Sequence, residues 1–183
     1  MNYELRAFDA VTLNATEAAW VEEASASPSL FPGDVSRIVT FARQYHDIGD
    51  AKTNDYAYGV FLGAEPVADS IVQIAATTEG VKLVKMLDCF VRPSIAEESL
   101  KFDQAALEKV VNIYVATIVG TFAVGDRHKA NVIKVYGRND PLLTTLAGIA
   151  GSLKEQPEIA EVIEAKIEGR WLVVRPKNGR KVS

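Results

Sequence analysis

Few residues of this chain have the type and spacing that catalysis needs. Asp88 is the only carboxylate in the apolar segment 81–91. A partly buried carboxylate can accept a proton from an ammonium group, directly or through water, so Asp88 is a candidate general base. It can equally be a solvent-facing charge or half of a structural ion pair. The neighbouring Cys89 would need a base to act as a nucleophile. Because His46 and His128 are distant in sequence, we expect a buried, inert thiol.

Composition restricts the class of protein. The chain has 183 residues, of which 48% are hydrophobic and 24% charged, so we expect one globular domain over residues 1–176. One cysteine and two histidines without a second ligand at metal spacing predict no metal site. A net charge of −4 argues against a general nucleic-acid binder. The basic tail 177–183 is either solvated or a docking strip for an acidic partner or nucleic acid.

The most apolar run of the chain, residues 110–125, contains no charge. Because a membrane-spanning helix needs about 20 apolar residues, we expect a buried helix and no membrane partner. The apolar surface of helix 105–124 would also allow a homodimer contact, although burial against a sheet explains it as well. The first residues lack an apolar core of signal-peptide length. A cytoplasmic protein is therefore expected.

Periodicity and turn signals predict an α+β fold with the element order βααβββαβαββ. Capping boxes are expected at Asn14–Glu17 and at Ser94–Glu97. Asp103 and Asp140 are the expected N-caps of later helices. The expected strands are 3–7, 56–62, 67–77, 81–91, 131–136, 159–167 and 170–175, and the expected helices are 14–26, 33–45, 105–124 and 140–153.

Element order and two short signatures resemble the GNAT superfamily of N-acetyltransferases over nearly the whole chain. The fourth strand ends in Val91-Arg92-Pro93, which is similar to the family's V-x-P exit. Strand 132–136 is followed by Asn139 and a helix start. The resemblance implies a GNAT-like mixed, mostly antiparallel sheet of about seven strands flanked by about four helices. The chain also resembles divergent GNAT-like proteins of tailed bacteriophages. This second resemblance implies that the protein is located in the host cytoplasm.

The resemblance implies a site for acetyl-CoA or another acyl-CoA. In the family, strands four and five splay apart and the pantetheine arm lies between them. Backbone N–H groups of Phe90 and Val91 would face the thioester carbonyl and stabilise the developing oxyanion. The diphosphate would lie on the following loop and helix start, near Arg92, Ser94 and Lys101. Asn139 would be a positioning group.

Two departures from the family pattern leave the function open. The phosphate-loop segment 92–101 has no glycine, and Glu97 and Glu98 place negative charge where a diphosphate would come. Leu146 lies where the family often has a tyrosine that acts as a general acid and protonates the leaving thiolate. One hypothesis is acyl transfer from acyl-CoA to a small-molecule or protein amine acceptor. The other is a catalytically degenerate binding module of phage type that acts on a host or partner protein.

Overall fold

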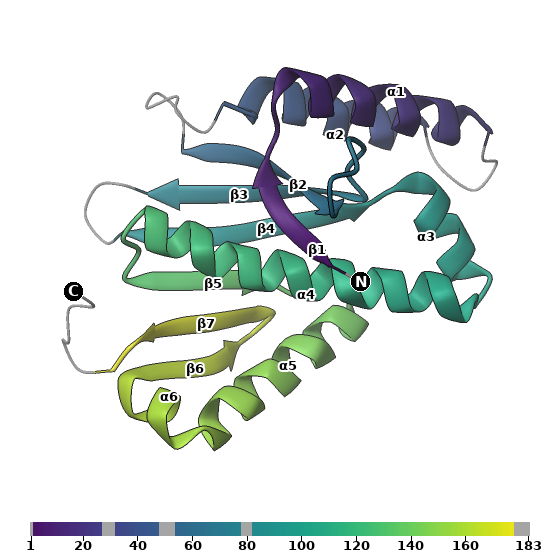
Figure 1. Cartoon of the computed structure of the whole chain (residues 1–183). Helices are drawn as coiled ribbons and strands as arrows, with labels where there is room; N and C mark the ends of the chain where they lie inside the picture. The colour runs from purple at the N-terminus through teal and green to yellow at the C-terminus, as the bar shows by residue number, and fades with distance from the viewer. Residues whose placement is uncertain (1, 27–31, 48–53, 78–81, 178–183) are drawn as a thin grey trace. The chain divides into compact units, whose positions relative to one another are not determined.

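The computed structural model describes residues 2–26, 32–47, 54–77 and 82–177 (Figure 1). The strands are β1 Tyr3–Ala7, β2 Asp55–Leu62, β3 Ser70–Thr77, β4 Leu83–Val91, β5 Val132–Tyr136, β6 Ile163–Glu168 and β7 Trp171–Pro176. The helices are α1 Ala10–Ala26, α2 Pro32–Tyr45, α3 Pro93–Leu100, α4 Gln104–Arg127, α5 Asp140–Glu155 and α6 Pro157–Val162.

The strands form a seven-stranded sheet in the order β1-β2-β3-β4-β5-β7-β6. β4 and β5 pair in parallel, whereas β1 with β2, β5 with β7 and β6 with β7 pair antiparallel. The expected α+β class with a mixed, mostly antiparallel sheet is therefore confirmed. Four of the helices have 14 residues or more, and the other two in the described part, α3 and α6, are short.

The chain divides into two compact units. The first comprises Met1–Ile74 and Cys89–Gly120, and the second comprises Ala75–Asp88 and Thr121–Ser183. Each unit has its own set of paired strands and covering helices. The boundary passes through β3, β4 and α4, so the end of β4 belongs to the first unit and its beginning to the second.

Helix α1 of the first unit begins earlier than the sequence predicted. Asp9 Oδ1 accepts the N–H of Thr12, and Thr12 Oγ1 accepts the N–H of Asp9, so each satisfies a donor that the helix start would leave unpaired. The predicted capping box at Asn14–Glu17 is wrong, because those residues lie inside the helix.

The core of the first unit lies between helices α1 and α2 and the strands β2 and β3. Trp20 of α1 is 1% exposed and donates its indole N–H to the carbonyl of Ala68 at 2.9 Å. Thr16, one turn earlier, accepts the N–H of Ala68 at 2.9 Å. Both backbone groups of a buried residue are thereby satisfied, which fixes α1 against the segment that leads into β3.

The second unit is built on β5, which pairs with the first half of β4 and with β7. The β6–β7 hairpin turns at Glu168–Gly169, as expected, and Gly169 has a φ of +60°, which glycine adopts without strain. α5 packs on β6 and β7 within this unit (Figure 1). Arg170 donates to the carbonyl of Gly137 and to Asp140, which ties the hairpin to the connection between β5 and α5.

Two further predicted elements differ from the structure, and two predictions fall on residues that it does not describe. Residues 157–162 form helix α6, where the sequence predicted a linker followed by a strand from residue 159; Pro157 starts the helix, since its missing N–H needs no partner there. β3 begins at Ser70 and not at residue 67. The predicted turn at 78–80 and the tail from 178 to 183 lie outside the described residues.

Helix α4 is the longest helix of the described chain and differs from its expected burial. By length and composition it could cross a membrane, with a mean hydropathy of 1.5 over its most apolar window, of which 28% is buried. Ile113, Thr117 and Ile118 lie on its buried face. Its opposite face carries Val111 and Val119, which are 57% and 63% exposed. One face of α4 is therefore buried and the opposite face is exposed, although both faces are apolar.

Candidate functional site

The parallel ladder between β4 and β5 is short. It pairs Leu83–Met86 with Val132–Val135 and ends at the pair Met86 and Val135, while β4 continues to Val91. The predicted thioester-binding residues of β4 all lie beyond the last pair. The resemblance requires strands that part at this level, and a ladder that ran the whole length of β4 would have contradicted it.

The alternation of β4 shifts by one residue just past this ladder. Val84 and Met86 are buried, but the next buried residue is Cys89 and not Asp88. The N–H groups of Leu83 and Arg92 both reach the β3 side, to Thr77 Oγ1 and to the carbonyl of Asp69. In a regular strand, N–H groups that point to the same side lie an even number of residues apart. Leu83 and Arg92 are an odd number of residues apart. One extra residue, as in a β-bulge, accounts for both observations.

The shift decides which backbone donors of β4 turn away from β3. Arg92 donates its N–H to the carbonyl of Asp69 at 2.8 Å, on the β3 side. Successive N–H groups of a regular strand point to opposite sides, so regular alternation up to Arg92 would direct the N–H of Phe90 toward β3 and that of Val91 away from it. This alternation favours Val91 over Phe90, and both remain predicted oxyanion donors.

Arg92 is held by two carboxylates at the end of β4. Its guanidinium donates to Glu23 Oε1 from Nε at 2.8 Å and from Nη2 at 2.5 Å, and to Asp69 Oδ1 from Nη1 at 3.3 Å. Burial lowers the pKa of Arg92, but the hydrogen bonds and charge of the two carboxylates outweigh it and raise the pKa. The cluster of one cation and two anions carries a net charge of −1.

Glu23 also occupies the N-terminus of α3. Its Oε2 accepts the N–H of Ser94 at 3.1 Å, one of the donors that a helix start leaves unpaired. Burial raises the pKa of Glu23, but the hydrogen bonds from Arg92 and Ser94 outweigh it and hold the pKa below its usual value. A carboxylate of the chain itself therefore takes the position in which the resemblance places a diphosphate.

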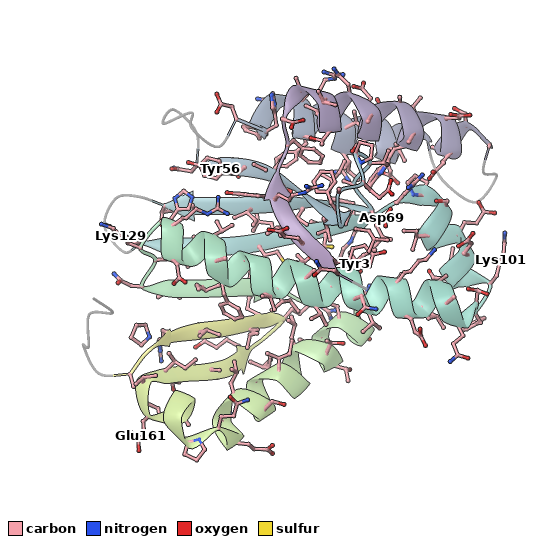
Figure 2. All side chains as sticks on the ribbon, viewed as in Figure 1. Tyr3, Tyr56, Asp69, Lys101, Lys129 and Glu161 are labelled. Atoms are coloured by element: carbon pink, nitrogen blue, oxygen red, sulfur yellow. The ribbon has the colours of Figure 1, made fainter. Side chains whose placement is uncertain are left out.

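Tyr3 of β1 extends the same cluster, and Figure 2 labels it together with Asp69. Its hydroxyl donates to Asp69 Oδ2 at 3.0 Å. Burial, followed by the charge of Asp69 and the hydrogen bond to it, raises the pKa of Tyr3 well above its usual value. The hydroxyl therefore stays protonated, and Tyr3 acts as a donor that holds Asp69 beside Arg92.

The other predicted anion-binding groups of α3 have different partners. The capping box at Ser94–Glu97 is wrong, because Arg92 is the N-cap residue and its own side chain makes no capping hydrogen bond. Lys101 lies at the far end of the helix, is largely exposed, and pairs with Glu97 at 3.1 Å, one turn away (Figure 2). The structure therefore brings Arg92 and Ser94 together and leaves Lys101 apart from them.

Asp88, the candidate base, forms an ion pair with Arg138 in the second unit. Both carboxylate oxygens lie 3.2 Å from Arg138 Nη1. Arg138 follows β5, and its side chain is more exposed than that of Asp88. This contact matches the structural-pair alternative, and a role in proton transfer would require the pair to open or to act through water.

Asn139, the expected positioning group, caps helix α5. Its Oδ1 accepts the N–H of Leu142 at 2.9 Å, and its backbone is extended. The sequence predicted Asp140 as the cap, but Asp140 is the first residue of the helix and pairs with Arg170. Asp103 does act as predicted, since its Oδ1 accepts the N–H of Ala106 at 2.8 Å at the start of α4.

Cys89 is buried, as expected for a structural thiol. Its Sγ lies 3.1 Å from Ser70 Oγ and 3.5 Å from Thr117 Oγ1. Hydroxyl groups do not act as bases at neutral pH, so these contacts favour packing over nucleophilic chemistry.

Two cavities lie within the second unit. The larger, of about 290 Å³, is mostly apolar and is lined by residues such as Phe122, Ile133 and Val174, with Asp126 and Arg175 among its polar groups. The other, of about 230 Å³, lies beside α5 and β6. Neither is lined by a residue that the sequence analysis predicted for the site.

The sequence analysis missed Glu23, Asp69 and Tyr3, which hold Arg92, and Arg138, which holds Asp88. Glu23 is separated from Arg92 by 69 positions, and Tyr3 from Asp69 by 66. No local spacing relates them. The signal that the sequence did contain was the arginine at the end of β4. A charged side chain on a half-buried strand requires a partner of opposite charge.

No family model matches the chain, and no curated protein matches it. Among solved structures, the chain is similar to a protein from Desulfovibrio desulfuricans assigned to the GNAT family of acetyltransferases, with 10% identity and a TM-score of 0.40 over 95% of this chain and 98% of that one. It is also similar to an acetyltransferase from Thermus thermophilus, with 14% identity and a TM-score of 0.42 over 96% and 97% of the two chains. Values this low assign no family, and the proposals below rest on the chain's own residues.

Proposed function

We propose that the chain is a GNAT-like acyltransferase that transfers an acetyl or other acyl group from acyl-CoA to an amine. The observation that carries the proposal is the short parallel ladder of β4 with β5, followed by the one-residue shift that turns the N–H of Val91 away from β3. A strand end of this kind presents a backbone donor that is not used within the β3–β4 pair.

In the proposed reaction the protein positions the two substrates and supplies one hydrogen-bond donor and one base. Bound acyl-CoA would supply an activated thioester. The neutral amine nitrogen would bond to the thioester carbonyl carbon, the carbon–sulfur bond would break, and the departing thiolate would take up the proton that the amide nitrogen loses. Val91 donates its N–H to the carbonyl oxygen as negative charge develops there, a contribution of about 3 kcal/mol for a well-placed donor. Before the attack, Asp88 accepts the proton that the ammonium group releases, through water or after its ion pair with Arg138 opens.

The two ends of an acyl-CoA fit this chain unequally. The thioester end meets a suitably oriented donor in Val91. The diphosphate end would meet a cluster of net charge −1, in which Glu23 already accepts the hydrogen bonds of Arg92 and Ser94. Binding of the diphosphate at this position therefore requires Glu23 to leave it.

Calorimetric titration with acetyl-CoA tests the proposal. We expect saturable heat with the wild-type chain, together with release of free CoA thiol when an amine acceptor is added. CoA without the acyl group is the matched ligand, since it shares the diphosphate but lacks the thioester carbonyl. No heat with either ligand at millimolar concentration would remove the proposal.

The second candidate is a binding module that has kept the fold without the chemistry. The position of Glu23 favours it, because a chain that no longer binds a diphosphate can fill the donors with its own carboxylate. The Glu23→Ala variant separates the two candidates. An acyltransferase binds acetyl-CoA in the wild-type form, whereas a degenerate module binds it, if at all, only after Glu23 is removed.

A further inference from the structure

The first unit has large apolar side chains that are exposed along one face of α4 and just before it. We define the α4 stripe as Leu107, Val111, Val115 and Val119, which follow each other at intervals of four residues on one helix face. Leu100 and Phe102, 68% and 86% exposed, lie just before the helix start. From residue 110 to residue 125 the chain has no charged side chain, so the stripe is apolar throughout.

Valine is a costly choice for an exposed helix face. A β-branched side chain loses rotamer freedom in a helix and lowers its stability relative to alanine, lysine or glutamate. Three valines on the solvent side of α4 therefore lower helix stability and gain nothing from water. Their presence is explained when the face is packed against another surface.

Phe102 bears a second, independent cost. Its φ is +59°, in the left-handed region where a bulky side chain is strained and where glycine commonly ends a helix. It follows Lys101, the C-cap of α3, and its N–H donates to the carbonyl of Ser99 at 3.1 Å. A strained backbone that holds a phenylalanine in solvent indicates that the ring itself is needed.

We propose that the α4 stripe, with Leu100 and Phe102, is the interface of a homodimer. The six side chains expose on the order of 600 Å², the upper end for a patch on a monomer and close to the roughly 800 Å² that each partner buries in a standard interface. A row at intervals of four residues is the ridge that packs into the groove of an identical helix in the commonest class of helix crossing. A two-fold axis between Val111 and Val115 places the same row on both copies.

Charge favours a second copy over a lipid surface. Helices that lie on membranes carry lysine and arginine along their polar face. The chain around this patch is at least as acidic as it is basic, with Glu97, Glu98, Asp103 and Glu108 beside Lys101 and Lys109. An anionic bilayer would be repelled, whereas an uncharged ridge from a second copy meets no like charge at its centre.

Sedimentation analysis over a range of concentrations tests the interface. We expect a reversible dimer, and the Val111→Lys/Val115→Lys variant should raise the dimer dissociation constant by at least about 100-fold because two charges enter its centre. Val11→Lys is the matched control, since Val11 on α1 is 71% exposed and lies outside the patch. Circular dichroism verifies that both variants fold.

Two further variants make the test independent of a disrupted fold. Val115→Cys should form a disulfide-linked dimer on mild oxidation, whereas Val11→Cys and the wild type, whose Cys89 is buried, should not. Phe102→Gly should raise the melting temperature of the monomer, because it relieves the positive φ, and yet weaken the dimer about tenfold. A wild-type chain that stays monomeric at about 100 μM, or that binds vesicles as a monomer, would overturn the proposal, as would a lysine variant that dimerises like the wild type.

Discussion

Replacement of Glu23 by alanine tests the charge cluster at the end of β4. The change removes the acceptor of three hydrogen bonds, two from Arg92 and one from Ser94, and leaves Arg92 with Asp69 alone. The side chains of Glu23 and Arg92 are 21% and 27% exposed, between a surface pair and a buried one. A surface pair contributes up to about 1 kcal/mol, and breaking a buried pair costs about 3–5 kcal/mol.

We therefore expect Glu23→Ala to lower the free energy of unfolding by about 2 kcal/mol, which for a chain of this size lowers the melting temperature by roughly 4–8 °C. Glu22→Ala is the matched control, because Glu22 is the neighbouring glutamate of α1 and is exposed. Its effect should stay within about 0.5 kcal/mol. Thermal and urea unfolding of the three proteins measure both values.

The pH dependence of this difference provides a separate check. The pKa of Glu23 in the folded protein lies below its ordinary value of 4.5, so its stabilisation is complete above that pH and is lost as pH falls toward the lower folded value. The gap between wild type and Glu23→Ala should be constant from neutral pH to about 5.5 and shrink below about 4.5. Equal stability of Glu23→Ala and Glu22→Ala at pH 7, or a gap that grows on acidification, would refute the cluster.

Three further outcomes are expected. Asp88→Asn should slow acyl transfer by about 100-fold or more if Asp88 accepts the proton, and undiminished turnover would exclude it as the base. Gly120→Ala should destabilise the chain by about 1–3 kcal/mol, because a Cβ there would meet the Leu5 side chain at 2.3 Å, whereas Gly148→Ala faces open space on α5 and should stabilise by up to about 1 kcal/mol; unfolding experiments in which the two variants agree would contradict this packing. Cys89 should react with a thiol reagent only as fast as the protein opens, and rapid labelling of the native chain would show that it is accessible.

The sequence predicted much of the fold because its signals are local. Alternating apolar residues and turn residues located all seven strands, and the hairpin at Glu168–Gly169 appears as expected. Errors occurred where two local signals competed. Asn14–Glu17 has capping-box spacing, but Asp9 and Thr12 cap the same helix one turn earlier. Residues from 159 onward read as a strand, but Pro157 begins a short helix.

The candidate site was only partly predictable. The position of Arg92 at the exit of β4 follows from the Val91-Arg92-Pro93 sequence, and the apolar strand around Asp88 made that carboxylate conspicuous. Their partners did not follow, because Glu23 and Arg138 reach them across 69 and 50 positions. Which backbone N–H of β4 turns away from β3 was equally hidden, since a one-residue shift leaves no mark in composition or periodicity.

The order of the strands and of the four long helices, the α+β class and the absence of glycine after β4 were determined by the sequence alone, since each is a matter of neighbouring residues, whereas the short helices α3 and α6 were not in the predicted order. Tertiary structure decided that a carboxylate of α1 fills the start of α3, that Asp88 is paired, and that one face of α4 stays exposed. The physical reason is that ion pairing and burial depend on which surfaces meet. Apolar periodicity indicates that a helix face is to be covered, but it does not specify by what.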